Sequence, residues 1–176
     1  MKSGLAVNGG PKAADNLAVP PWPPTSNDVA DRLRQMYLSR KWSFNGPHEM
    51  EFAARFARHH NAAYGVMMAN GTVTLECILT ALGVGRGDEV IVPAFTWIAT
   101  AMAVAYTGAK PVLVDCEPDT WCLDPAGTEA AITPRTKAII AVHLYGSMAH
   151  IDRLTAVAAK HSIPLIEDCA HAHGGK

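Results

Sequence analysis

Residues 137–167 read KAIIAVHLYGSMAHIDRLTAVAAKHSIPLIE. Two runs in this stretch are almost entirely apolar, Lys137–His143 and Ile163–Glu167, and apolar residues at helical spacing lie between them over Ile151–His161. A strand that is apolar throughout needs cover on both faces, and a helical crossover joins strands that run parallel. The stretch therefore predicts a strand–helix–strand unit in a mostly parallel sheet.

The same alternation continues toward the N-terminus as far as Tyr64. Further strands are expected at Tyr64–Ala69, Glu89–Pro93 and Pro111–Asp115, and further helices at about Thr72–Leu82, Ile98–Tyr106 and Pro125–Ala131. The predicted fold class is α/β, with three α/β/α layers around a mainly parallel sheet. Residues 1–63 are expected to form a separate N-terminal part, with a Pro-rich arm to about residue 26 and then two helices, at about 27–40 and 48–60.

Composition and charge exclude several classes of function. Fifteen basic and sixteen acidic residues give a formal net charge of −1, and no run of Lys or Arg occurs, so neither nucleic acid nor an anionic membrane is an expected partner. No apolar stretch is long enough to span a bilayer, and the N-terminal residues do not resemble a signal peptide. The four cysteines form no C-x-x-C pair, which favours reduced thiols in a cytoplasmic protein.

Parallel sheets bind ligands at the carboxyl ends of their strands, so the residues that follow each expected strand are the candidates for a site. After the first comes Asn70-Gly71-Thr72, at the start of a helix. The free N–H groups of Gly71, Thr72 and Val73, with the Thr72 hydroxyl, would bind a phosphate or carboxylate. The same residues also suit a simple strand-to-helix turn, and both interpretations remain open at this point.

Two further candidates follow later strands. Trp97 comes soon after the second strand and could present its flat face to an aromatic ligand, although packing in the core is the alternative. Asp168 ends the apolar run Ile163–Ile166, where a carboxylate is costly unless it is paired. A protonated ring nitrogen of a cofactor would supply the pairing, whereas the alternative is an Asp that caps the following turn.

A metal site is considered and not expected. His171 and His173, with Asp168 and His143, are ligands of suitable type, but they lack a helical i, i+4 spacing and no further cluster completes a pattern. The glycines of Gly83–Gly87 imitate a nucleotide fingerprint, but they follow a helix and precede a strand, which is the reverse of the required context. We expect a helix end and a turn there.

Taken together, these segments resemble the DegT/StrS family of sugar aminotransferases, which has the fold of aspartate aminotransferase. The resemblance runs from about Trp22 to the end of the chain and rests on five anchors in this order: Asn70-Gly71-Thr72, Gly87–Pro93, Thr96-Trp97, Thr133–Lys137 and Glu167–Gly174. It implies pyridoxal 5′-phosphate (PLP) as cofactor. It also implies that residues 64–176 are the first part of the large, PLP-binding domain of a fold-type-I enzyme.

The resemblance assigns roles to the candidates. Gly71 and Thr72 would bind the PLP phosphate, and Trp97 would stack on the pyridine ring. Asp168 would pair with the pyridinium nitrogen and keep it protonated, so that the ring can accept electrons.

Two histidines complete the predicted site. His171 would act beside the ring hydroxyl, in a position where many members of the family have Gln, and His143 would lie near the cofactor on the neighbouring strand. Histidine at position 171 is similar to the branch that makes aminocyclitols and aminohydroxybenzoate. The resemblance implies transfer of an amino group from glutamine or glutamate to a keto-sugar or a keto-cyclitol of the scyllo-inosose type, in a homodimer that shares its active sites.

One family feature is expected to be missing. In the family the Schiff-base lysine follows the Asp-containing loop, whereas Lys176 aligns with a loop position and is not that lysine. We therefore expect the chain to stop before the lysine and, by itself, to be inactive. Two other functions remain open: a non-catalytic module that binds PLP or a sugar phosphate, and a sugar 3-dehydratase of the same family.

Overall fold

The computed structural model describes residues 4, 6–12, 14, 17–43 and 46–175, so Lys176 lies outside it. The chain forms two compact units, Met1–Phe52 and Ala53–Lys176. The first contains a short 3-10 turn, η1 (Ala6–Asn8), helix α1 (Asn27–Ser39) and the start of helix α2 (Pro47–His59). Both helices expected in this region are present, with ends within a residue of the expected ones. No residue of α1 is buried.

The second unit alternates helices with strands. Its elements after α2 are α3 (Gly71–Ala81), β1 (Glu89–Pro93), α4 (Ala99–Tyr106), β2 (Lys110–Val114), α5 (Pro125–Ala131), β3 (Thr136–Val142), the 3-10 turn η2 (Leu144–Gly146), α6 (Ile151–His161) and β4 (Leu165–Asp168). The four strands pair in parallel in the order β2-β1-β3-β4. Among the described residues, no helix is both long and apolar enough to cross a membrane.

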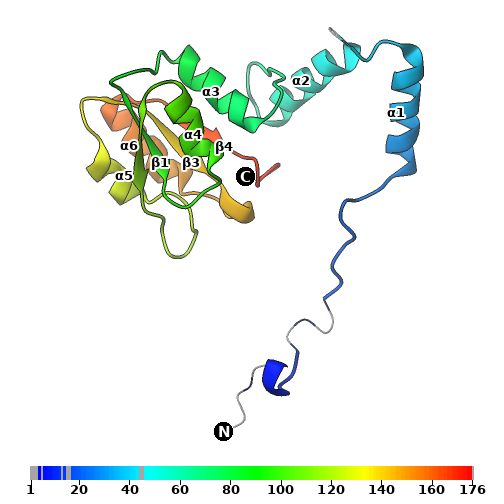
Figure 1. Ribbon diagram of the computed structural model, residues 1–176, viewed down its shortest axis with the longest axis horizontal. Helices are drawn as coiled ribbons and strands as arrows, with labels where there is room; N and C mark the ends of the chain where they lie inside the picture. The colour runs from blue at the N-terminus through cyan, green and yellow to red at the C-terminus, as the bar shows by residue number, and fades with distance from the viewer. Residues whose placement is uncertain (1–3, 5, 13, 15–16, 44–45, 176) are drawn as a thin grey trace. The chain divides into compact units, whose positions relative to one another are not determined.

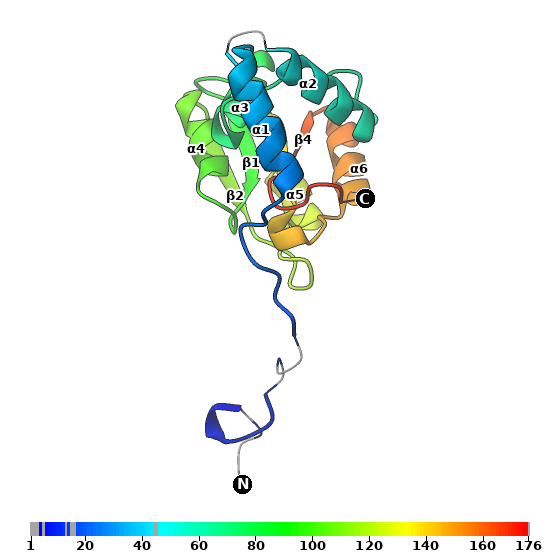
Figure 2. The same ribbon diagram turned by 90° about the vertical axis from the view of Figure 1, so that its right-hand side faces the viewer.

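Alternate residues of the strands face opposite sides of the sheet, and each side has its own core. On one side Val90, Val92 and Ile140 pack in a cluster with residues of α3 and α4. On the other side Ile91 and Ile139 pack in a cluster with residues of α6 and with the end of α5. Figures 1 and 2 show the strands between these two pairs of helices. The three-layer α/β/α prediction is therefore confirmed.

The strand expected at Tyr64–Ala69 is wrong. This segment has no regular secondary structure, and Tyr64 and Val66 are 88% and 79% exposed. Instead of pairing with a strand, the segment passes close to α2. A Cβ added at Gly65 would lie only 2.3 Å from the carbonyl oxygen of Ala53 in that helix. An apolar run becomes a strand only where a partner strand takes up its backbone hydrogen bonds, and within the described residues this segment has none.

The glycines before β1 form a turn, as expected. Gly83 follows the end of α3 with a φ of +74°, a conformation that L side chains rarely adopt, and its N–H donates to the carbonyl oxygen of Thr80. Gly87 also has a positive φ, +95°. The nucleotide-binding alternative therefore has no support in the local geometry.

A buried carboxylate closes the amino end of the sheet. The Glu89 side chain is 5% exposed and accepts hydrogen bonds from Thr133 Oγ1 (2.6 Å) and from Arg135 Nη2 (2.8 Å) and Nε (3.2 Å), with Lys110 Nζ at 3.9 Å. The Thr133 hydrogen bond, followed by those from Arg135, lowers the pKa of Glu89. The anchor Thr133–Lys137 thus contains the residues that hold Glu89.

Candidate functional site

A cavity of about 230 Å³ lies at the carboxyl ends of the strands in the second unit. It is formed by the start of α3, the segment after β1, the end of β3 and the end of β4 with the residues that follow. Its lining residues are Gly71, Thr72, Leu75, Thr96, Trp97, Ala99, Thr100, Val142, Asp168, Ala170 and His171. Five of the six expected site residues therefore meet in one cavity, although they come from parts of the chain up to 100 residues apart.

The start of α3 offers two unpaired backbone donors. Asn70 caps the helix, and its Oδ1 accepts the N–H of Val73 at 3.0 Å. The expectation that the Val73 N–H is free is therefore wrong, because the cap uses it. Within the described residues, the N–H groups of Gly71 and Thr72 have no acceptor, and a Cβ added at Gly71 would meet no protein atom within 4 Å. This helix start can bind an anion through two N–H groups and the Thr72 hydroxyl.

Trp97 follows β1 on the segment that leads into α4. Its side chain is 72% exposed, so the alternative of packing in the core is excluded. The segment is fixed by a hydrogen bond from the Ala94 N–H to the carbonyl oxygen of Val114 (2.7 Å) and by one between the hydroxyls of Thr96 and Thr100 (3.2 Å). An indole on a fixed segment at the cavity wall can stack on a flat ligand.

Asp168 is the last residue of β4 and is half-buried. Its Oδ1 accepts the N–H of Ala170 at 3.1 Å, so the turn cap proposed as an alternative does exist. Among the described residues no cation pairs with the carboxylate. A half-buried charge that lacks a counter-ion favours a cationic group of a ligand beside it.

His171 is held by Tyr145, a residue of the turn η2 that follows β3. Its Nδ1 accepts the N–H of Tyr145 at 3.3 Å, and its ring stacks on that of Tyr145 at 5.5 Å with planes 8° apart. A neutral imidazole that accepts at Nδ1 carries its proton on Nε2. His171 therefore offers an Nε2–H donor.

His143 is not at the cavity. It follows β3, and its side chain is fully buried. Its Nδ1 accepts the N–H of Ala149 and its Nε2 lies 3.1 Å from Glu167 Oε2. Val142, not His143, is the register partner of Asp168, so the alternation of side chains turns that of His143 to the opposite face of the sheet. Its expected place near the cofactor stays a prediction. Only the backbone of His143 reaches Asp168, through an N–H···O bond of 3.1 Å to its carbonyl oxygen.

The metal ligands considered from the sequence do not gather into one group. The described residues contain two other groups whose ligand atoms lie within 4.8 Å of one another: His143, Glu167 and Cys169, and Glu117, Asp119 and His150. In the first, acceptance at Nδ1 leaves His143 Nε2 protonated and unable to bind a metal. Burial raises the pKa of the Cys169 thiol, which disfavours the thiolate that a metal needs.

The second group also has its own partners. Glu117 accepts from Arg153 Nη1 at 2.8 Å, so a guanidinium already pairs with its carboxylate, and His150 Nε2 lies 3.3 Å from it.

Two side-chain contacts at or beside the cavity were not predicted from the sequence. Thr96 and Thr100 are four residues apart, a spacing that could have indicated that their side chains meet. Tyr145 carries no such signal, since its contact with His171 depends on the turn η2, where Tyr145 adopts a φ of +53°.

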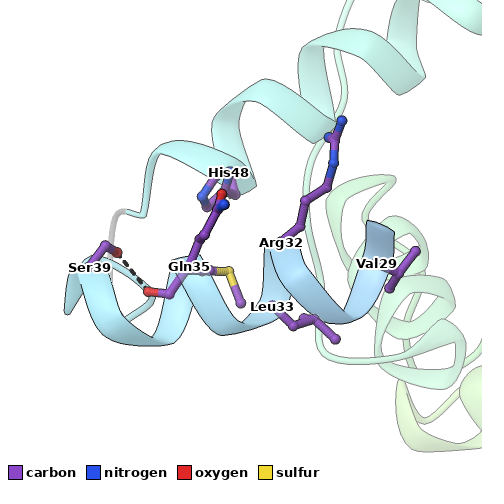
Figure 3. A pocket seen from close by; sticks show the side chains of 7 residues that line it. Val29, Arg32, Leu33, Gln35, Ser39 and His48 are labelled. Carbon is purple, nitrogen blue, oxygen red and sulfur yellow. Dashed lines mark hydrogen bonds between the residues drawn. The ribbon is translucent and has the colours of Figure 1, made fainter. Parts of the chain in front are cut away.

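The first unit contains a hollow of its own, of about 580 Å³ (Figure 3). It is lined by six residues of α1 and by His48. Ser39 beside it donates to the carbonyl oxygen of Met36 at 2.6 Å, within the same helix. This hollow contains none of the expected site residues and no carboxylate, so the cavity at the sheet is the better candidate.

Comparison with known proteins gives consistent results. The model of the DegT/DnrJ/EryC1/StrS aminotransferase family matches residues 25–176. An L-glutamine:2-deoxy-scyllo-inosose aminotransferase of Micromonospora echinospora is 48% identical over 178 residues, which cover 98% of this chain and 42% of that protein. The chain thus spans about two fifths of the length of that relative.

Solved structures agree. That of 3-amino-5-hydroxybenzoic acid synthase is 41% identical, with a TM-score of 0.82, over 90% of this chain and 43% of its own. A protein of Streptococcus pneumoniae described as a sugar aminotransferase, in its PLP form, is 34% identical with a TM-score of 0.78, over 88% of this chain and 43% of its own.

Proposed function

This chain belongs to the DegT/DnrJ/EryC1/StrS aminotransferase family, and on that premise we propose that the complete protein is a PLP-dependent aminotransferase. It moves an amino group from glutamine or glutamate to a keto-cyclitol of the scyllo-inosose type. The observation that carries the proposal is the meeting of Gly71, Thr72, Trp97, Asp168 and His171 in one cavity at the carboxyl edge of a parallel sheet. The relative from Micromonospora echinospora supports the choice of donor and ketone.

The residues of the cavity fit PLP group by group. The phosphate suits the start of α3, where the N–H groups of Gly71 and Thr72 have no acceptor in the described part of the chain. The pyridine ring suits the exposed indole of Trp97, and its protonated nitrogen suits the carboxylate of Asp168, which has no cation of its own among the described residues. The phosphate, the ring and the protonated nitrogen of PLP thus each have a complementary group in the cavity.

PLP, when bound, supplies an electron-deficient ring that stabilises negative charge developing on the substrate. Asp168 favours the protonated form of that ring, because its half-buried charge is stabilised by a nearby positive one. The bond from the Ala170 N–H keeps the carboxylate in place. Gly71 and Thr72 hold the phosphate independently of Asp168, so that binding and activation of the cofactor depend on different residues.

His171 supplies a donor at the same cavity. Since its Nδ1 accepts from Tyr145, its Nε2–H is available to an oxygen acceptor on the ligand. Such a hydrogen bond fits the ring hydroxyl of PLP, the role that the family resemblance implies.

The proposal also includes the compartment, the oligomeric state and the substrates of the complete protein. We propose a cytoplasmic homodimer that uses an amino acid and a ketone as its substrates. All four cysteines are free, as suits a reducing compartment.

The test uses the complete protein, loaded with PLP and given glutamine with scyllo-inosose or 2-deoxy-scyllo-inosose. The expected product is the corresponding aminocyclitol, identified by mass spectrometry. A matched reaction with a 4-keto sugar nucleotide distinguishes cyclitol from sugar amination. Binding of PLP without amination of any ketone would contradict the proposal and favour a non-catalytic binding module.

A further inference from the structure

His143 is the one expected site residue that the cavity does not contain, yet it is more tightly enclosed than any of the others. Its side chain is fully buried, and both ring nitrogens have partners, Ala149 N–H at Nδ1 and Glu167 at Nε2, each at 3.1 Å. A buried imidazole with two directed partners fixes the segments that those partners belong to. The two segments are the loop of residues 144–149 and the end of β4.

The hydrogen bond to Ala149 closes that loop. The loop begins directly after His143 and returns to it six residues later, so one ring nitrogen holds both of its ends. Inside the loop Tyr145 and Gly146 have φ values of +53° and +83°. A non-glycine residue in this conformation costs energy and persists only where the surroundings hold it.

The strained residue, Tyr145, contacts His171, a residue that lines the cavity. The Tyr145 N–H donates to His171 Nδ1 at 3.3 Å, and the two rings stack. His171 itself is exposed and lines the cavity. A chain of contacts thus leads from His143 on the far face of the sheet, through the loop, to His171 at the cavity.

Hydrogen bonding fixes the tautomer of both histidines, His143 and His171, at the two ends of this series of contacts. Both imidazoles accept a backbone N–H at Nδ1, so each neutral ring carries its proton on Nε2. His143 directs its Nε2–H to Glu167, whereas His171 has its Nε2–H available for a ligand. Without the Tyr145 bond, His171 would be free to exchange tautomers or to rotate.

We propose that His143 is a positioning residue, which fixes the 144–149 loop so that Tyr145 holds His171 with its Nε2–H available to an acceptor oxygen of the bound cofactor or substrate. The inference rests on the proposed function, and it assigns to His143 a role through His171 in place of direct contact with the cofactor.

Two substitutions in the complete protein separate the two ring nitrogens of His143. His143→Asn places an amide oxygen near the position of Nδ1 and keeps an acceptor for Ala149. His143→Gln places its amide near the position of Nε2, so it keeps a contact with Glu167 and loses that acceptor. We expect kcat to fall on the order of 10-fold in the Gln variant, as is typical for loss of a supporting residue, and to recover largely in the Asn variant. His161→Gln makes the same change at a histidine beside Glu129, away from the loop, and should leave kcat unchanged.

A double-mutant cycle shows whether His143 acts through His171. If it does, His143→Gln should lower kcat on its own but have little further effect in a His171→Ala background. Equal effects in both backgrounds would overturn the inference, since a general structural defect does not depend on His171.

The tautomer gives a readout that needs neither a variant nor turnover. Nitrogen-15 NMR of the complete wild-type protein should show His171 with an unprotonated Nδ1 and a protonated Nε2. The opposite tautomer would overturn the inference, even if His143→Gln fails to fold. An inactive wild-type protein with the expected tautomer would instead count against the proposed function.

Discussion

Two carboxylates stand at opposite ends of the same sheet, and their surroundings differ. Glu89, at the amino end, is buried and accepts from Thr133 and Arg135, with Lys110 nearby. Asp168, at the carboxyl end, is half-buried, and among the described residues its carboxylate accepts the N–H of Ala170 alone. The chain thus supplies the counter-charge for Glu89 and, within its described residues, none for Asp168.

The difference separates charges that stabilise the fold from charges that serve a ligand. Taking a carboxylate out of water is costly unless hydrogen bonds and cations compensate. A buried carboxylate that stabilises the fold therefore has such partners within the protein itself. One that lacks a cation and lines a cavity gains its partner when a cationic ligand binds. The following substitutions test this contrast, beginning with the largest expected effect.

Asp168→Asn in the complete protein should reduce the rate of amino transfer on the order of 10²-fold or more. The amide keeps an acceptor for the Ala170 N–H but has no charge to favour a protonated cofactor ring. The midpoint of thermal unfolding should hardly change. Steady-state kinetics at saturating PLP, with thermal unfolding of the same samples, measure both effects, and near-normal turnover would make Asp168 a turn cap only.

Thr72→Ala should weaken PLP binding about tenfold, as expected for loss of one hydrogen bond to a charged group, while costing less in rate once PLP is saturating. The Kd for PLP is measured by equilibrium dialysis. Thr80→Ala is the matched control, because the Thr80 hydroxyl donates to the carbonyl oxygen of Glu76 on the same helix, away from the cavity. Equal losses in both variants would argue against a phosphate site at the start of α3.

Glu89→Gln should show the reverse of Asp168→Asn, with a midpoint of thermal unfolding lower by several degrees and a normal rate per folded molecule. The substitution removes the charge that pairs with Arg135, whose Nε and Nη2 both donate to Oε1 of Glu89. Glu129→Gln is the control, since Glu129 and its partner Lys160 are both exposed and such pairs contribute little. A larger fall of the unfolding midpoint in Glu129→Gln than in Glu89→Gln would contradict a stabilising role for the Glu89 carboxylate.

The pH dependence gives a smaller effect of known sign. The partners of Glu89 lower its pKa in the folded state from the ordinary value of 4.5, so its contribution to stability is fully present above that value. It is lost as the pH falls through the lowered pKa of the folded state. The difference in melting temperature between the wild type and Glu89→Gln should therefore be constant near neutral pH and narrow in acid. A difference that widens in acid would show that the charge of Glu89 is not the stabilising feature.

Much of this arrangement could be predicted from the sequence. Strand ends are readable from apolar runs, and parallel strands bring their carboxyl ends together, which is how Trp97 and Asp168 were expected to meet. Thr72 was expected there because it follows the run Tyr64–Ala69, which is not a strand, and it reaches the cavity as part of the start of α3. The face on which the His143 side chain lies could not be predicted, because the register between β3 and β4 decides which side chain shares a face with Asp168, and no pattern within one strand specifies register.

Two other features depend on information that the sequence pattern does not contain. The apolar run Tyr64–Ala69 resembles a strand, but whether a partner strand lies beside it is a property of the fold. The contact of Tyr145 with His171 depends on a left-handed residue in a turn, and tyrosine does not signal that conformation.

The central claim is that the Asp168 carboxylate pairs with a cationic group of the bound cofactor. This claim is tested most directly at the pyridine nitrogen of PLP, which Asp168 would face. PLP labelled with nitrogen-15 in its ring can be bound to the complete wild-type protein and to Asp168→Asn, and the NMR shift of that nitrogen reports whether it carries a proton. We expect a protonated ring nitrogen in the wild type and an unprotonated one in Asp168→Asn at neutral pH. An unprotonated nitrogen in the wild type, or the same protonated state in both proteins, would contradict the account.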